Sequence, residues 1–295
     1  MEGYRMQDGS SDDSHRKGYH EHLDDIHPES ALKKMRTAGS ISISPELFEK
    51  MYLSPQNKVP GDLRKKFANP TPIAICGFVM SLGPLSCDLM GWRGAGGNGA
   101  ASIPVYLFFG GILMIIGGLL EFILGNTFPS VVFTAFGATW LSYGGTFLPQ
   151  LNAYAAYAPP TASSPAEGLQ TQGFNASIGK CLGFWTLSMA LLCFVFLICS
   201  LRTNIVFVVT FFALIFHFGF ATGAFWALGA DYAGNAHFAS RLLVGAGASA
   251  FVATAAGWWI LFTILLASVD FPFALPVGDL STAIRGASER GRSQV

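Results

Sequence analysis

The stretch "GGILMIIGGLLEFILGNTF", residues 110–128, links two apolar runs through a tight turn and places Glu121 among leucines and phenylalanines. Its apolar part has the length and hydrophobicity of a segment that crosses a lipid bilayer. A carboxylate at the centre of a spanning helix costs about 2.5–3.5 kcal/mol on insertion scales, so such a group usually faces a cavity or a partner. The stretch therefore predicts a helical membrane protein with a polar group inside its bundle.

The composition of the whole chain supports a membrane protein. Of its 295 residues, 51% are hydrophobic and 12% are charged, whereas soluble domains carry about 25% charged residues. Only eight charged residues lie between positions 73 and 269. The formal net charge of zero argues against a nucleic-acid partner, because binding to phosphates requires a basic face.

Six apolar runs, each close to the length that crosses a bilayer, predict an all-α membrane protein built as a six-helix transmembrane bundle. The runs are 73–92, 103–124, 128–149, 181–201, 204–229 and 242–267. Three parts follow from them: an N-terminal tail over 1–66, a transmembrane transporter domain over 67–269, and a C-terminal tail over 270–295. The first tail is polar, lacks apolar periodicity and is predicted to be largely disordered.

Basic residues near the ends of the runs predict the orientation in the membrane. The segment "LRKKF", Arg202 and the arginines of the C-terminal tail all fall on one side if six spans are counted. Both termini are therefore expected in the cytoplasm. The long connection between the third and fourth runs then lies outside, with a glycosylation sequon at Asn175. Two alternatives stay open: Asn175 is glycosylated, or the sequon is unused because it lies too near the bilayer.

Polar residues within the runs allow two interpretations each. Glu121 either accepts a proton or gates a solute path, or it hydrogen-bonds neighbouring backbone and fixes the following turn. Asn69 either only caps the first helix, with Pro70 in the first turn, or helps to present the helix N-terminus to an anion. His217 lies mid-way along the fifth run, and a hydrogen bond across helices is favoured over a metal site. The pair Gly83-Pro84 predicts a kink or break in the first helix.

Motifs of enzymes, metal sites and cofactor sites were not found in the sequence. The glycine-rich segment "GWRGAGGNGAAS" has no lysine, and there is neither a serine elbow nor a histidine or carboxylate spacing suited to a metal. The five cysteines fall in apolar stretches and are predicted to be buried, unpaired thiols. We therefore expect no enzymatic activity, no metal and no cofactor.

Three stretches of the chain together resemble the acetate uptake transporter family, which includes the bacterial succinate–acetate permease and fungal acetate and ammonia-export-type membrane proteins. The first is Asn69-Pro70-Thr71-Pro72-Ile73-Ala74, similar to N-P-A-P-L-G. The second is the opening stretch with its G-G…E…G-N-T-F pattern, and the third is "LPVGDLS" near the C-terminus. The resemblance covers about residues 67–283.

The resemblance implies a six-helix subunit with its own narrow path, assembled into a ring-like homo-oligomer, a hexamer in the family. It implies an apolar-aromatic constriction formed by Phe78, Phe136 and Leu214. Asn69 would supply polar contact at the start of the first helix, and Glu121 would take a coupled proton or organise the cytoplasmic mouth. In the family pattern a tyrosine stands where this chain has Phe136.

The function that this resemblance implies is transport of small monocarboxylates, acetate first, across the plasma membrane with a coupled proton. The partners expected are the acetate anion, the proton, the lipid bilayer and further copies of the chain. Two alternatives stay open. One is export of ammonia or ammonium, and the other is a membrane sensor of the same family that has lost transport, which the missing tyrosine motivates.

Overall fold

The computed structural model describes residues 67–148, 151, 158–164, 167, 172–280 and 283–284. The predicted disordered tail over 1–66 lies outside the described residues. Within the described ranges the regular structure is helical, apart from one isolated bridge between Asn204 and Asp279. This agrees with the predicted all-α class.

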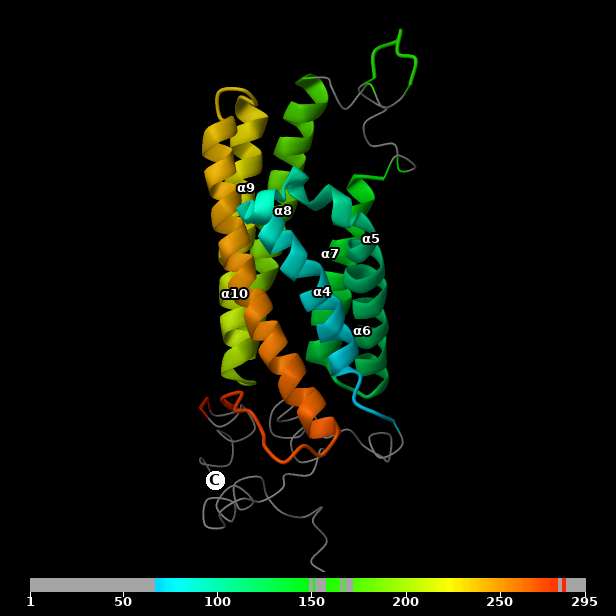
Figure 1. The fold of residues 1–295 in the computed structure, drawn as a ribbon, viewed down its shortest axis with the longest axis vertical. Helices are drawn as coiled ribbons and strands as arrows, with labels where there is room; N and C mark the ends of the chain where they lie inside the picture. The colour runs from blue at the N-terminus through cyan, green and yellow to red at the C-terminus, as the bar shows by residue number, and fades with distance from the viewer. Residues whose placement is uncertain are drawn as a thin grey trace, which may run out of the picture. The chain divides into compact units, whose positions relative to one another are not determined.

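The helices follow the six apolar runs in order (Figure 1). The first run is α4 (Thr71–Met90), and short 3₁₀ turns η2 (Trp92–Gly94) and η3 (Gly97–Ser102) follow it. The second run is divided into α5 (Ile103–Val105), the π-helical segment η4 (Tyr106–Leu113) and α6 (Met114–Ile123). The remaining helices are α7 (Thr127–Thr146), α8 (Gln172–Ser200), α9 (Ile205–Ala230) and α10 (Ala236–Ser268).

Five helical stretches in the described part of the chain are long and apolar enough to cross a membrane. They are Thr71–Met90, Ile103–Ile123, Gly179–Ser200, Ile205–Ala230 and Ala236–Ser268. The third predicted span corresponds to α7, which has 20 residues but carries many glycine, serine and threonine residues and is not among the five. The six helices are present, and the count of six crossings stays a prediction.

Two helices begin earlier than the apolar runs suggest. α8 begins at Gln172 and α10 at Ala236, whereas the runs begin at 181 and 242. A hydropathy pattern marks only the part of a helix that is apolar, and the backbone hydrogen bonds of a helix continue into polar sequence. Of the predicted kink or break at Gly83-Pro84, the break is wrong, because α4 is one helix with Pro84 inside it, and the kink stays a prediction.

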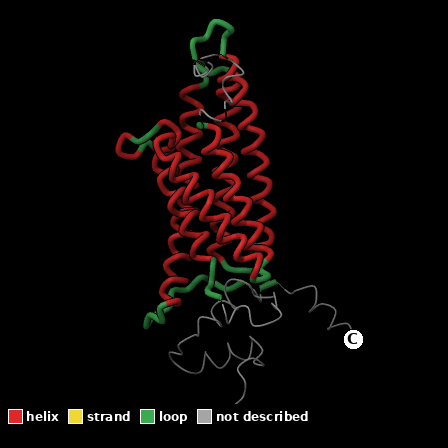
Figure 2. The backbone as a smooth tube through the Cα atoms, turned by 90° about the vertical axis from the view of Figure 1, so that its right-hand side faces the viewer, coloured by secondary structure: helices red, strands yellow, loops and turns green. Residues whose placement is uncertain are grey.

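The bundle has two halves, one formed by η4, α6 and α7 and the other by α8, α9 and α10, and α4 contacts both. α4 packs against η4 and α6 on one side and against α10 on the other, while α7 packs along η4 and α6. α8, α9 and α10 follow one another as packed neighbours. Figure 2 shows the helices running along one common direction, with the connections at the two ends. α4 is thereby placed to line the space between the halves.

Small residues permit this close packing. A Cβ added at Gly257 of α10 would lie 2.7 Å from Val79 of α4, and one at Gly117 of α6 would lie 2.7 Å from Ala74. Contacts under 3.0 Å require something to shift, so these two positions fix how near α10 and α6 approach α4. Close approach at small residues is typical of helix packing in membranes.

The outer surface of the bundle carries many large apolar side chains. Phe122, Phe184, Leu191, Phe212 and Phe262 are all more than half exposed. Soluble monomers rarely expose contiguous apolar patches of this kind. The surface is therefore suited to contact with lipid or with another protein surface.

All five cysteines are unpaired. Cys193 is buried, as predicted, but Cys181 and Cys199 are exposed on α8, and Cys76 and Cys87 are partly exposed. The prediction of buried thiols is wrong for Cys181 and Cys199, because apolar sequence in a membrane helix marks the outer face as well as the core.

The C-terminal segment returns to the turn between α8 and α9. The Ile205 amide donates to the Gly278 carbonyl at 2.8 Å, and the Leu280 amide donates to the Thr203 carbonyl at 3.0 Å. The indole of Trp259 on α10 donates to the Pro276 carbonyl at 2.8 Å. The motif "LPVGDLS" is thus tied by its backbone to two helices.

Candidate functional site

A cavity of about 70 Å³ lies between the two halves of the bundle. Its walls come from α4, α7, α8, α9 and α10. They are formed by Phe78, Leu82, Leu85, Leu89, Phe136, Thr139, Trp140, Tyr143, Trp185, Thr186, Leu214, His217, Phe218, Ala221, Phe225 and Leu243. One water needs about 10–15 Å³ of such volume, so the cavity has room for a few waters or a solute of a few heavy atoms.

The three residues predicted to form a constriction meet at this cavity. Phe78 from α4, Phe136 from α7 and Leu214 from α9 all line it, and all three are buried. The rings of Phe78 and Phe136 meet edge to face, with 6.3 Å between their centroids. The structure brings the three together, and their action as a selectivity constriction stays a prediction.

The cavity also contains polar groups that the sequence analysis did not select. Thr139 and Tyr143 follow Phe136 on α7 at spacings of three and seven residues, which puts them on one helix face. Thr186 of α8 hydrogen-bonds the hydroxyl of Thr222 on α9 at 2.9 Å. The helical spacing from Phe136 was the one sequence signal that pointed to Tyr143.

His217 makes the hydrogen bond across helices that the sequence analysis favoured. Its Nδ1 lies 2.9 Å from the carbonyl oxygen of Ala246 on α10. Its ring also packs on Phe218, with 4.8 Å between the centroids. The side chain is buried within the bundle and lines the cavity.

Glu121 lies elsewhere, in a buried cluster at the turn between α6 and α7. Its carboxylate accepts hydrogen bonds from the Thr71 hydroxyl of α4 and from Asn126 Nδ2, the latter at 2.5 Å. The side chain has no exposed surface. These contacts join the start of α4 to the turn after α6 through side chains, whereas the anchoring interpretation expected bonds to neighbouring backbone. The anchoring role and the proton-accepting or gating role both stay predictions.

Asn69 lies beside the same cluster. Its Oδ1 accepts a hydrogen bond from the Thr71 amide at 2.9 Å. Asn69 was expected to cap α4, but the N-cap position is Pro70, so Asn69 bonds the first helical residue from one position further out. Thr71 precedes Phe78 by seven residues, a rise of about 10 Å along the helix. Neither Asn69 nor Glu121 is among the residues that line the cavity.

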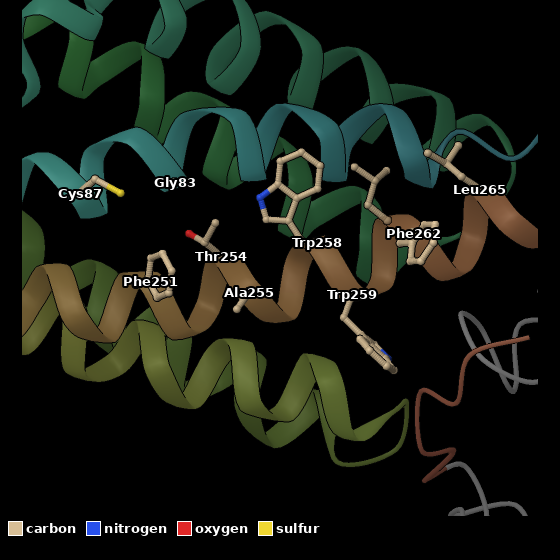
Figure 3. A pocket seen from close by; sticks show the side chains of 10 residues that line it. Gly83, Cys87, Phe251, Thr254, Ala255, Trp258, Trp259, Phe262 and Leu265 are labelled. Atoms are coloured by element: carbon tan, nitrogen blue, oxygen red, sulfur yellow. The ribbon is translucent and has the colours of Figure 1, made fainter. Parts of the chain in front are cut away.

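A larger hollow of about 730 Å³ follows the contact between α4 and α10 (Figure 3). Its walls are mostly apolar and include Cys87, Phe251, Trp258 and Phe262. Several of these side chains belong to the exposed apolar surface. Since it opens on the outside of the bundle, this groove is less suited to a solute path than the smaller central cavity.

The sequon residue Asn175 lies within α8 (Gln172–Ser200) and not in a loop. Its side chain is outside the described residues. Glycosylation at this position stays a prediction.

Comparison with known proteins places the chain in a family. A family model described as GPR1/FUN34/yaaH matches residues 53–282. The chain belongs to this family. Protein alcS of Aspergillus fumigatus, strain CBS 144.89, is 44% identical over 256 residues, which are 86% of this chain and 91% of that protein.

Two further relatives of the GPR1/FUN34/yaaH chain are named for transport. Acetate permease A of Emericella nidulans is 24% identical over 235 residues, 78% of this chain and 72% of that protein. Ammonia transport outward protein 2 of Saccharomyces cerevisiae is 30% identical over 154 residues, 50% of this chain and 48% of that protein. One name refers to acetate, an acid, and the other to ammonia, a base. Membership of the family therefore does not identify the solute.

The solved structure of the bacterial acetate channel SatP has the same fold as this family member. The TM-score is 0.55 at 24% identity, and the match covers 72% of this chain and 99% of that chain. The helical bundle is therefore shared with a solved membrane protein.

Proposed function

We propose that the chain is a plasma-membrane transporter of small monocarboxylates, acetate first, which pass through the cavity between α4, α7 and α9. The observation that carries the proposal is that Phe78, Phe136 and Leu214 line a single cavity of about 70 Å³. A volume this small favours acids of two or three carbons over longer ones. The name of the relative acetate permease A supports the same solute class.

The physical task is to move a weak acid through a layer that excludes ions. A carboxylate without partners is very costly to transfer into an apolar environment. A short path with a few hydrogen-bonding groups lowers this barrier, and a proton that travels with the anion removes the net charge. Transport coupled to a proton is therefore the mode that we propose, with Glu121 as one candidate for a group that senses it.

The assembly and orientation belong to the same proposal. We place six helices across the bilayer, α7 included, with both termini in the cytoplasm. Ser130, Phe136, Gly137 and Trp140 of α7 are buried, which suits a spanning helix that packs closely within the bundle. The exposed apolar surface is suited to a ring of identical subunits.

Uptake of radiolabelled acetate by cells that lack other carriers tests the proposal, with the external pH recorded at the same time. We expect uptake that rises in acidic medium and is lost in Leu214→Trp, which fills the cavity. Leu191→Trp, on the exposed face of α8, is the matched control and should transport normally. No uptake above background from acidic to neutral medium would overturn the proposal.

Export of ammonia is the second candidate, favoured by the relative named for that activity. An uncharged base passes an apolar cavity without a carboxyl partner. Efflux of labelled methylammonium that acetate does not inhibit, together with absent acetate uptake, would select this candidate. Absence of both activities in a protein that reaches the membrane would leave the sensor alternative.

A further inference from the structure

The cavity is lined by one histidine, His217, which has no role in the proposed apolar constriction. His217 is 7% exposed and lines the cavity together with Phe78, Phe136 and Leu214. Its one hydrogen bond among the described residues joins Nδ1 to the Ala246 carbonyl. Because a carbonyl oxygen only accepts, Nδ1 carries a proton. In the neutral ring the lone pair therefore lies on Nε2.

Few polar side chains line the cavity that could hydrogen-bond Nε2 of His217 in place of a solute. α4 contributes only Phe78 and leucines to the cavity, α8 contributes Trp185 and Thr186, and α10 contributes Leu243. α7 contributes Tyr143, the other titratable side chain among the lining residues, besides Thr139 and two aromatic rings. No lining residue carries a fixed charge, so His217 is the strongest proton acceptor in the cavity.

We propose that Nε2 of His217 binds the carboxyl group of the transported acid and exchanges a proton with it. This inference rests on the proposed transport of small acids and names the group that recognises them. The undissociated acid donates its O–H to Nε2. The O–H bond then breaks as the Nε2–H bond forms, leaving an imidazolium beside a carboxylate, and the transfer reverses when the acid leaves.

The energetic reason is that this pair has no net charge at any stage. A lone carboxylate among phenyl and leucyl side chains pays the full desolvation penalty, whereas an ion pair with a hydrogen bond offsets most of it. The Nδ1 bond to Ala246 holds the ring in one orientation throughout. His217 thus couples the passage of the acid to its proton inside the cavity, whereas Glu121 lies outside it.

The test uses the purified full-length protein in liposomes, with radiolabelled acetate uptake measured over a range of pH. His217→Asn keeps an amide N–H near Nδ1 for Ala246 but removes Nε2. His217→Gln keeps a polar group near Nε2 that does not titrate. We expect uptake by His217→Asn to fall by at least about tenfold, as for the loss of one hydrogen bond to a charged group. His217→Gln should retain more uptake, with a flattened pH profile.

The matched control is His237→Asn, at an exposed histidine near the start of α10, which should behave as the wild type. Transport by the wild type combined with an unchanged rate and pH profile in His217→Asn would overturn this inference and leave the proposed function intact. No transport by the wild type would instead overturn the proposed function.

A second measurement does not depend on a variant that folds. Wild-type protein with ¹⁵N-labelled histidine is titrated with acetate and followed by NMR, with His217→Gln used only to assign the resonance. We expect acetate to shift the Nε2 resonance of His217 and sulfate to leave it unchanged. An Nε2 resonance that does not respond to acetate would overturn the inference.

Discussion

Thr71, at the start of α4, donates a hydrogen bond to the carboxylate of Glu121, which lies 50 residues later near the end of α6. Asn126, in the turn that follows, donates to the other carboxylate oxygen. One buried side chain thus joins three segments: the first helix, the second apolar run and the turn into α7. The carboxylate that decides the interpretation of the sequence is a junction between elements.

Exchanging the donor Asn126 and the acceptor Glu121 tests whether Glu121 has a structural role or a role in proton coupling. Glu121→Gln should destabilise the protein by about 1–3 kcal/mol, because the buried hydrogen bonds from Thr71 and Asn126 then lose their charged acceptor. The double change Glu121→Gln with Asn126→Asp should restore stability, since Gln then donates to Asp and still accepts from Thr71. Thermal unfolding of the purified protein in detergent measures both effects.

The same pair of variants decides whether Glu121 senses the proton. A double variant that is stable but shows a flattened pH profile of acetate uptake would assign the coupling role to Glu121. Normal uptake at every pH would leave the residue as an anchor. If the single variant melts at the wild-type temperature, the anchoring role itself is wrong.

Phe136→Tyr should change selection among short acids. Phe136 is buried at the cavity wall, and a hydroxyl there occupies space and adds a hydrogen-bond donor. We expect acetate uptake to increase severalfold relative to butyrate, because the longer chain loses room while the carboxyl gains a partner. Competition of unlabelled acids against labelled acetate measures this. Phe122→Tyr, the same change on the exposed face of α6, is the control; an equal profile in both variants would remove Phe136 from the selective wall.

Leu214→Ala should have the opposite effect on selection. It removes three carbon atoms from a side chain that is 1% exposed and lines the cavity. We expect propionate and butyrate uptake to rise relative to acetate, with a loss of stability of about 2–5 kcal/mol. Leu191→Ala, on the exposed face of α8, should alter neither quantity. Unchanged uptake ratios in a folded Leu214→Ala protein would show that the acids pass elsewhere.

The helices could be predicted from sequence where the apolar run and the helix coincide. α4, α6 and α9 end within about three residues of the predicted runs, because their ends are also the ends of their apolar surface. The starts of α8 and α10 could not be predicted in this way, since the helix there continues into polar sequence. The predicted break at Pro84 was wrong because a proline removes only one backbone hydrogen bond of the helix. The contacts of α4 with neighbouring helices on both sides hold the helix together.

The candidate site was only partly predictable. Phe78, Phe136 and Leu214 lie on three helices far apart in sequence, so no local periodicity brings them together, and the family resemblance supplied the set. His217 was noticed as an unusual polar residue, but its contact with the cavity depends on how α9 is rotated against α10. The two interpretations of Glu121, as a path residue or as an anchor, stayed open because sequence does not show that Thr71 and Asn126 lie beside it.

Gly257→Ala tests the close approach of α10 to α4. The added Cβ would lie 2.7 Å from Val79 and 3.1 Å from Phe78. Something must shift, and overpacking of this kind costs about 1–3 kcal/mol. Gly219→Ala on α9 is the control, because an added Cβ there meets nothing within 4 Å and alanine favours the helix. We expect a lower melting temperature for Gly257→Ala alone; equal melting temperatures would show that the two helices have room to move apart.

The C-terminal segment gives the last test, because its attachment depends on one glycine. Gly278 has φ +68°, a conformation that L side chains rarely adopt, and an added Cβ would lie 2.7 Å from Ile205. Gly278→Ala should therefore weaken the hydrogen bonds to Ile205 and Thr203 and release the segment.

Limited proteolysis of the purified protein measures this release. We expect cleavage after residue 269 to be severalfold faster in Gly278→Ala, with the helices themselves still protected, because the strained conformation costs about 1–2 kcal/mol. Gly96→Ala, where an added Cβ has open space, is the control. Trp259→Phe removes the indole donor to Pro276 and should accelerate cleavage independently of backbone strain. If neither variant is cleaved faster than the wild type, contacts other than these backbone hydrogen bonds hold the segment on the α8–α9 turn.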